Sequence, residues 1–98
     1  MDEKADSLKY LDYIRKIPCI ITGQPAEPHH LRAIGSSGER KKPSRRHYTA
    51  VPLSRDIHIA AHVLTSSKFK ERYSINLWAE AHRLFTNYVL EYHINEKL

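Results

Sequence analysis

Two histidines four residues apart, His58 and His62, are the strongest chemical signal in this sequence. They lie in a stretch that reads as a helix, where residues i and i+4 share one face and can bind a common cation. A second pair, His29 and His30, follows Pro28 in a run that reads as a strand. If strand and helix pack together, three or four imidazoles converge, so the residues predict a metal site.

A strongly basic stretch separates the two histidine pairs. Residues 39–47 contain five of the sixteen lysines and arginines and no apolar side chain, in a chain of net charge +5. Clustered cations bind phosphates by releasing counterions, although a run of charge can also be a solvated loop. Its place between the histidine pairs favours a loop that contacts the phosphates of a polyanionic partner. The contacting residues are then Arg40, Lys41, Lys42, Arg45 and Arg46.

Length and composition limit the class of protein. With 98 residues, of which 41% are hydrophobic, the chain predicts one domain with one modest core over 1–98. It has no apolar run long enough for a bilayer, and its N-terminus lacks the pattern of a secretory signal, so we expect a soluble cytoplasmic protein. Cys19 is the one cysteine, which excludes an intramolecular disulfide.

Periodicity and turn signals predict an α+β fold. The helix over 6–17 carries Leu8, Leu11 and Ile14 at helical spacing, with Asp6 or Ser7 as its N-cap. The remaining elements are a hairpin of strands over 19–22 and 27–34, a loop over 35–46, an extended segment over 47–53, a helix from Ser54 or Asp56 to about 65–67, and, after a connecting segment, an amphipathic helix over 77–92.

The motifs in this order resemble those of the HNH endonucleases, also called ββα-metal or His-Me finger nucleases. The likeness is greatest to small phage and bacterial members of the recombination-enhancement nuclease type. It rests on four fragments within about 18–63: Pro28-His29-His30, Lys42-Pro43-Ser44, Pro52-Leu53 and His58 to His62. The resemblance implies a small core of a β-hairpin and one helix, here flanked by an N-terminal helix and a long C-terminal amphipathic helix.

The resemblance also implies an activity, the metal-dependent hydrolysis of DNA phosphodiester bonds, with nicking as the expected cut and phage or bacterial recombination or repair as the setting. Carried over by position, His29, His58 and His62 are the metal ligands and His30 is the general base. One divalent ion is expected, with Mg²⁺, Mn²⁺, Zn²⁺ and Ni²⁺ as candidates, although imidazoles suit the transition metals better than Mg²⁺. Neighbours on a strand point to opposite faces, so His29 and His30 reach one phosphate only through a bulge, a twist or a wrapping substrate.

The sequence departs from the family at its structural zinc. Relatives often hold a structural zinc with two pairs of ligands, whereas the corresponding positions here read Cys19, Thr22, Ser54 and Ile57. A tetrahedral zinc site does not close with one thiolate, so we expect no structural zinc. The other histidines, His47, His82 and His93, are interpreted as surface or partly packed residues.

Two classes of function remain open at this stage. The first is an active endonuclease, and the second is a catalytically silent DNA-binding module of the same fold that uses the basic loop. A toxin-like nuclease is a third, weaker alternative. The sequence leaves two further points open. One is the oligomeric state, and the other is whether His29 or His30 is the metal ligand and which of them is the base.

Overall fold

The computed structural model describes residues 2–31 and 43–94. Its elements in chain order are α1 (Glu3–Arg15), β1 (Glu27–His30), the 3₁₀ helix η1 (Pro43–Thr49), β2 (Ala50–Leu53), α2 (Arg55–Val63), α3 (Ser66–Tyr73), α4 (Leu77–Val89) and the π-helical turn η2 (Leu90–Ile94). The predicted α+β class is therefore confirmed. Among the residues so described, no helix is long and apolar enough to cross a membrane.

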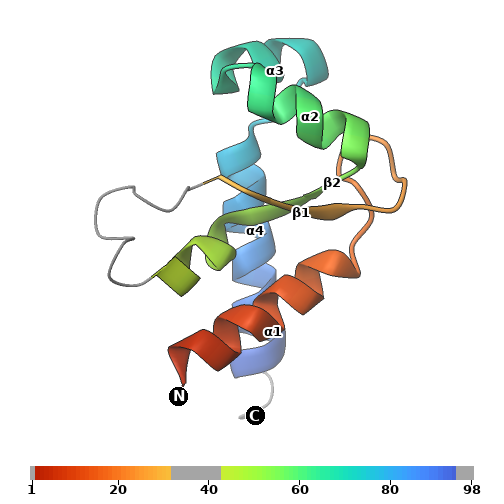
Figure 1. Cartoon of the computed structure of the whole chain (residues 1–98). Coiled ribbons are helices and arrows are strands. Elements are labelled where there is room, and N and C mark those ends of the chain that lie inside the picture. The colour runs from red at the N-terminus through yellow and green to blue at the C-terminus, as the bar shows by residue number, and fades with distance from the viewer. Residues whose placement is uncertain (1, 32–42, 95–98) are drawn as a thin grey trace.

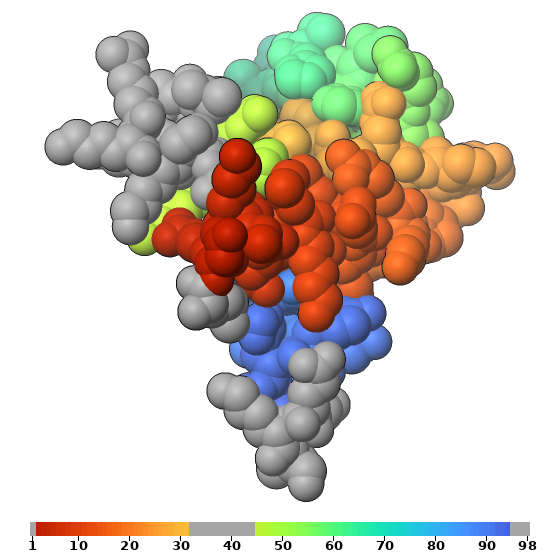
Figure 2. Space-filling model, turned by 60° about the horizontal axis from the view of Figure 1, so that its bottom comes forward, coloured from red at the N-terminus to blue at the C-terminus, as the bar shows by residue number. Residues whose placement is uncertain are grey.

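The two strands cross the middle of the molecule and are covered by helices (Figure 1). β1 and β2 pair antiparallel, with His29 opposite Val51 and His30 opposite Ala50. Helix α1 packs against both strands on one side, α2 packs against both on the other, and α4 contacts β2. Figure 2 shows α1 and the segment that follows it lying across one face, with the last described turns of the chain emerging beside them.

The predicted hairpin between 19–22 and 27–34 is wrong. Residues 19–22 form turns, in which the N–H of Cys19 donates to the carbonyl of Gln24 and the N–H of Gly23 donates back to Cys19. Gly23 has a φ of 73°, a left-handed conformation that glycine adopts without strain. These local bonds use the backbone groups that a strand would need, so β1 pairs with β2 instead.

Helix α1 begins three residues earlier than predicted. Its N-cap is Asp2, whose carboxylate accepts hydrogen bonds from the N–H groups of Lys4 and Ala5. The buried face consists of Ser7, Tyr10, Leu11 and Ile14, whereas Leu8, expected in the apolar stripe, is exposed. The shifted start leaves Asp6 free to face the core rather than to cap the helix.

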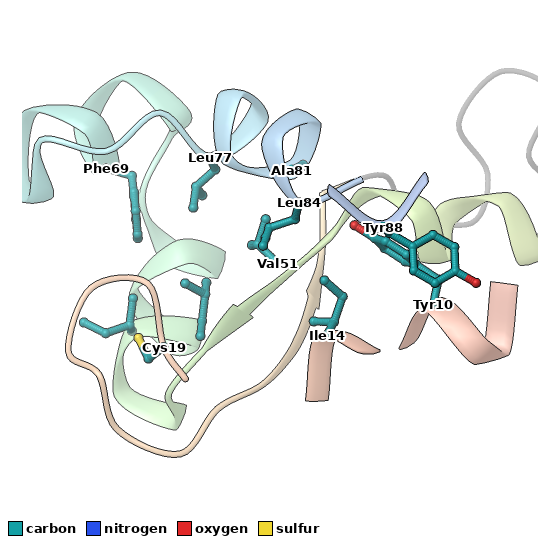
Figure 3. Packing of buried hydrophobic residues seen from close by; sticks show 11 residues of the cluster. Tyr10, Ile14, Cys19, Val51, Phe69, Leu77, Ala81, Leu84 and Tyr88 are labelled. Atoms are coloured by element: carbon teal, nitrogen blue, oxygen red, sulfur yellow. The ribbon is translucent and has the colours of Figure 1, made fainter. Parts of the chain in front are cut away.

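The hydrophobic core joins helices from both ends of the chain to β2. Figure 3 shows Val51 and Leu84 in the middle of this cluster, Phe69 toward one end and the Tyr10 and Tyr88 rings toward the other. The Tyr10 and Tyr88 rings pack edge to face, with centroids 4.9 Å apart. The buried cluster comprises Tyr10, Ile14, Cys19, Val51, Leu53, Ile57, Phe69, Leu77, Ala81, Leu84 and Tyr88.

Of the two α-helices that follow α2, one is predicted and one is not predicted by the sequence pattern. The amphipathic pattern over 77–92 forms α4, which buries Leu77, Ala81, Leu84 and Tyr88 before the π-helical turn begins at Leu90. The segment expected to be a connection is α3, with Thr65 as its N-cap and Phe69 in the core. Its short polar sequence has a single buried side chain, which leaves little periodicity to detect.

Asp6 connects three segments that are distant in sequence. Its carboxylate accepts hydrogen bonds from the hydroxyls of Tyr48 in η1 and Tyr88 in α4, and it lies 3.2 Å from Nε2 of His93 in η2. Burial raises the pKa of Asp6, but the two hydroxyl donors and His93 outweigh it, so the pKa falls below its ordinary 3.8. The ionised form of Asp6 therefore stabilises the packing of α1 on η1 and α4.

We expect Asp6→Asn to lower the free energy of unfolding by about 2 kcal/mol at pH 7, the usual size of hydrogen bonds to a charged group. Because the folded pKa is depressed, this contribution is complete above pH 3.8 and is lost as the pH falls through the folded pKa. Urea unfolding of both proteins at pH 7 and pH 3 measures the difference. Asp12→Asn, in an exposed pair with Arg15 on the same helix, is the control, and an equal loss in both variants contradicts this role.

Candidate metal centre

Three imidazoles from two elements meet on one side of the sheet. His29 comes from β1, and His58 and His62 come from successive turns of α2. One possible ligand nitrogen from each ring lies within 4.8 Å of the other two. The His58 and His62 rings are stacked, with centroids 4.9 Å apart, and His29 stands edge-on to both at 4.7 and 4.9 Å. We call these three residues the histidine cluster.

Helix α2 presents its two histidines because its opposite side is anchored. The helix starts after Ser54, and the N–H of His58 donates to the carbonyl of Ser54. Ile57 is buried in the core, which fixes the rotation of the helix about its axis. His58 and His62, one turn apart, then lie along the face that packs on β1.

The surroundings of His29 are those expected of a metal-binding histidine. The residue is 6% exposed, and its Nδ1 is buried with no hydrogen-bond partner among the described residues. Burial, followed by the proximity of His58, His62 and His30, lowers the pKa of His29 from 6.5 to about 4. His29 is therefore neutral at pH 7, the form in which an imidazole binds a metal.

The spacing of the three rings suits a single ion. Nitrogens that share one tetrahedral ion at about 2.0–2.1 Å are roughly 3.3 Å apart, so ligand atoms that now lie within 4.8 Å of one another would have to approach by up to about 1.5 Å. The buried Nδ1 of His29 costs free energy while it has no partner among the described residues, and an ion bound through this nitrogen would remove that cost. The donor set and its burial therefore fit one divalent cation.

Glu27, which the sequence analysis does not assign to the site, orients one of the three rings. Its Oε1 accepts a hydrogen bond from Nδ1 of His58 at 2.8 Å and lies 3.2 Å from Nε of Arg55. With its proton on Nδ1, a neutral His58 keeps the lone pair on Nε2 for a metal. The sequence does contain a signal for this role, because Glu27 precedes His29 by two residues and so shares its face of the strand.

His30 makes its contacts with η1 rather than with α2. Its Nε2 lies 2.9 Å from Nδ1 of His47. The register of β1 on β2 is regular at both histidines, so His29 and His30 have different neighbours without a bulge. Both nevertheless border one cavity of about 270 Å³, which is also lined by His62 and the half-exposed Trp78. The cavity thus supplies the shared access that the sequence leaves unexplained.

The environment of His30 keeps it unprotonated. Burial, followed by the charges of Arg46, His47, His58 and Arg15, lowers its pKa from 6.5 to about 4. The sequence predicts His47 only as a surface or partly packed histidine, and its contact with His30 gives it a more specific position. No local pattern identifies this contact, because 17 residues separate the two rings.

The predicted basic loop is described only at its C-terminal end. Arg40, Lys41 and Lys42 lie outside the described residues. Arg45 is exposed, and its Nε donates to the Glu3 carboxylate at the start of α1. Arg46 is half-buried and close enough to lower the pKa values of both His30 and His47. Of the two arginines of the basic loop that the structure describes, Arg46 is therefore the one that lies near His30 and His47.

The four positions that correspond to the structural zinc of HNH endonucleases come together in the fold, and only Cys19 among them is a thiol ligand. The hydroxyl of Thr22 donates to Ser54, the Ser54 hydroxyl lies 3.5 Å from Sγ of Cys19, and Ile57 belongs to the same buried cluster as Cys19. Burial raises the pKa of Cys19, but hydrogen bonds from Ser54 and Thr22 outweigh it and lower the pKa to about 7. Hydroxyl contacts and apolar packing occupy this corner, and one thiolate alone does not complete a zinc site.

Comparison with known proteins places the chain in one family. Residues 2–91 match the family model described as "Protein of unknown function (DUF968)", and the chain belongs to this family. No curated protein and no solved structure matches the chain. The family description names no activity.

Proposed function

We propose that this DUF968 protein is a metal-dependent endonuclease that hydrolyses DNA phosphodiester bonds. The observation that carries the proposal is the meeting of His29, His58 and His62 in one cluster, with His30 on the border of the same cavity. In this proposal β1, β2 and α2 are the ββα-metal core. The resemblance of the sequence motifs to those of HNH endonucleases supports the same assignment.

The histidine cluster holds one divalent cation. Imidazole ligands suit Mn²⁺, Ni²⁺ or Zn²⁺, whereas Mg²⁺ prefers oxygen ligands. When bound, such a cation supplies charge neutralisation at the phosphate and stabilises the leaving oxygen. Glu27 contributes by fixing the orientation of His58, since their hydrogen bond selects one tautomer of that ring.

His30 acts as the general base. A base must be unprotonated at the working pH and must lie beside the reacting group. The low pKa of His30 satisfies the first condition, and its place on the cavity beside His29 satisfies the second. The nearby positive charge of Arg46 favours the approach of a phosphate to this cavity.

Cleavage of supercoiled plasmid DNA tests the proposal. The purified protein is incubated with Mg²⁺, Mn²⁺, Ni²⁺ or Zn²⁺, and nicked or linear product is expected with at least one of them. EDTA should abolish cleavage without reducing helical circular dichroism, since none of the cluster residues belongs to the hydrophobic core. His62→Ala serves as the inactive control. Binding without cleavage under all four metals contradicts the proposal and favours the DNA-binding module.

The basic residues are expected to bind backbone phosphates without reading bases. Replacing Lys41, Lys42 and Arg46 by Ala should weaken binding about equally for all DNA sequences. It should also flatten the slope of log K against log salt by up to ~0.9 for each phosphate of duplex DNA that the variant no longer neutralises. Fluorescence anisotropy at several salt concentrations measures both effects. Arg83→Ala, which removes an exposed arginine paired with Glu80, is the control, and an unchanged slope in the triple variant places the DNA elsewhere.

A further inference from the structure

The contact between His30 and His47 constrains where both rings carry their protons. Nε2 of His30 and Nδ1 of His47 are 2.9 Å apart, and the ring centroids are 5.1 Å apart with a tilt of 54°. At this distance two ring nitrogens form a hydrogen bond only if one is protonated and the other is not. The bond therefore couples the tautomer of one ring to that of the other.

Only one direction of this bond leaves His30 able to accept a proton. If His47 donates, a neutral His30 carries its proton on Nδ1 and has no free lone pair. If Nε2 of His30 donates, its Nδ1 lone pair stays free and His47 accepts through Nδ1. A general base needs the second arrangement, in which the neutral His47 carries its own proton on Nε2.

The backbone that carries His47 is held by contacts of its neighbours with α1 and α4. His47 lies in η1. The residue after it, Tyr48, also lies in η1 and donates a hydrogen bond to Asp6 of α1. The Tyr48 ring also packs against Tyr10 and Phe85, with centroids 5.5 and 5.4 Å apart. At the end of η1, the hydroxyl of Thr49 donates to the carbonyl of Arg46. Packing on α1 and α4 thus fixes the part of η1 that carries His47.

We propose that His47 is the positioning residue of the general base: Nδ1 of His47 accepts a hydrogen bond from Nε2 of His30, so that His30 presents its Nδ1 lone pair to the attacking water. This inference rests on the proposed endonuclease function. When the water oxygen forms its bond to phosphorus, its proton passes to Nδ1 of His30, and the leaving oxygen departs with the bonding electrons and takes a proton from solvent. The charged ring then donates a stronger hydrogen bond to His47, which favours the transition state.

Three substitutions of His47 separate this role from a structural one. His47→Phe keeps a ring without nitrogen, His47→Asn places an amide oxygen near the position of Nδ1, and His47→Gln reaches instead toward the position of Nε2. We expect His47→Phe to lower kcat on the order of 10- to 100-fold with little change in KM, the range for partners that orient a functional histidine. His47→Asn should recover most of that loss and His47→Gln should not. His82→Phe, the same change at an exposed histidine of α4, is the matched control.

The tautomers provide a readout that does not depend on cleavage. Long-range ¹H–¹⁵N spectra of the metal-free protein at pH 7.5 should show His30 protonated on Nε2 and His47 unprotonated on Nδ1. The His30 preference should be lost in His47→Phe. Should that variant fail to fold by circular dichroism, the comparison of Asn with Gln and the wild-type tautomers still decide the question.

The outcomes distinguish this inference from the proposed function. If the wild-type protein cleaves and His30→Ala does not, normal cleavage by His47→Phe overturns the positioning role. A proton on Nδ1 of His30 in the wild-type protein also overturns it. A wild-type protein that binds DNA but cleaves with none of the metals overturns the endonuclease function and, with it, the catalytic role of His47, whatever direction of the bond the spectra show.

Discussion

His30→Ala is expected to retain metal and DNA binding but to cleave DNA roughly 10²- to 10⁴-fold more slowly, the usual contribution of a positioned general base. The physical reason is that water is a poor nucleophile at neutral pH and needs a group that removes its proton. His30 is unprotonated there because burial and neighbouring positive charges lower its pKa to about 4. Its contacts lie with His47 rather than with the histidine cluster, so its removal should leave the metal ligands in place.

Single-turnover cleavage with saturating metal measures this loss, and calorimetric metal titration shows whether binding is kept. His29→Ala is the informative comparison, because His29 precedes His30 on the same strand but belongs to the cluster. The expected pattern is loss of metal binding in His29→Ala and loss of rate alone in His30→Ala. The reverse pattern would exchange the two roles, and normal cleavage by both variants would refute the nuclease assignment.

His62→Ala is expected to reduce the affinity for a divalent transition metal by more than about 100-fold, since a direct ligand matters more than the partners that orient ligands. His62 is the best of the three for this test because its side chain is exposed, so the variant should fold normally. His29 is buried and His58 also bonds to Glu27, so their removal changes more than a ligand.

Calorimetric titration with Mn²⁺ or Ni²⁺ measures the affinity. The midpoint of thermal unfolding shows whether the variant is folded. His82→Ala, in which an exposed histidine of α4 is removed, controls for nonspecific binding of metal to surface imidazoles. At most one equivalent of metal is expected in the wild-type protein. Equal affinities of the wild-type protein and His62→Ala would show that the ion, if any, binds outside the histidine cluster.

Local periodicity is sufficient to predict the parts of the protein that depend on neighbours in sequence. The apolar pattern over 77–92 predicts α4 because its buried residues, Leu77, Ala81, Leu84 and Tyr88, recur at helical spacing. The shared face of His58 and His62 follows from their spacing on one helix in the same way. These features depend on the geometry of a single helix, and the spacing of residues in the sequence is enough to predict which of them share a face.

Tertiary structure decides the features that depend on pairing between distant segments. The apolar run over 19–22 has the composition of a strand, but its backbone closes into turns and β1 pairs with β2. Short segments have weak local preferences, so the partner that buries them sets their conformation. The same reason applies to α3, which contributes Phe69 to the core from an otherwise polar sequence.

The candidate site also combines features that follow from local sequence with features that require the tertiary structure. The type and spacing of His29, His58 and His62 predict that these rings meet, and the fold brings the three together. The role of His30 as a base comes from the resemblance to HNH endonucleases and stays a prediction. The hydrogen bonds that orient two of these rings, from His58 to Glu27 and between His30 and His47, require the folded chain. Such contacts join residues 31 and 17 positions apart, and they form only because β1 lies between α2 and η1, each of which contacts it.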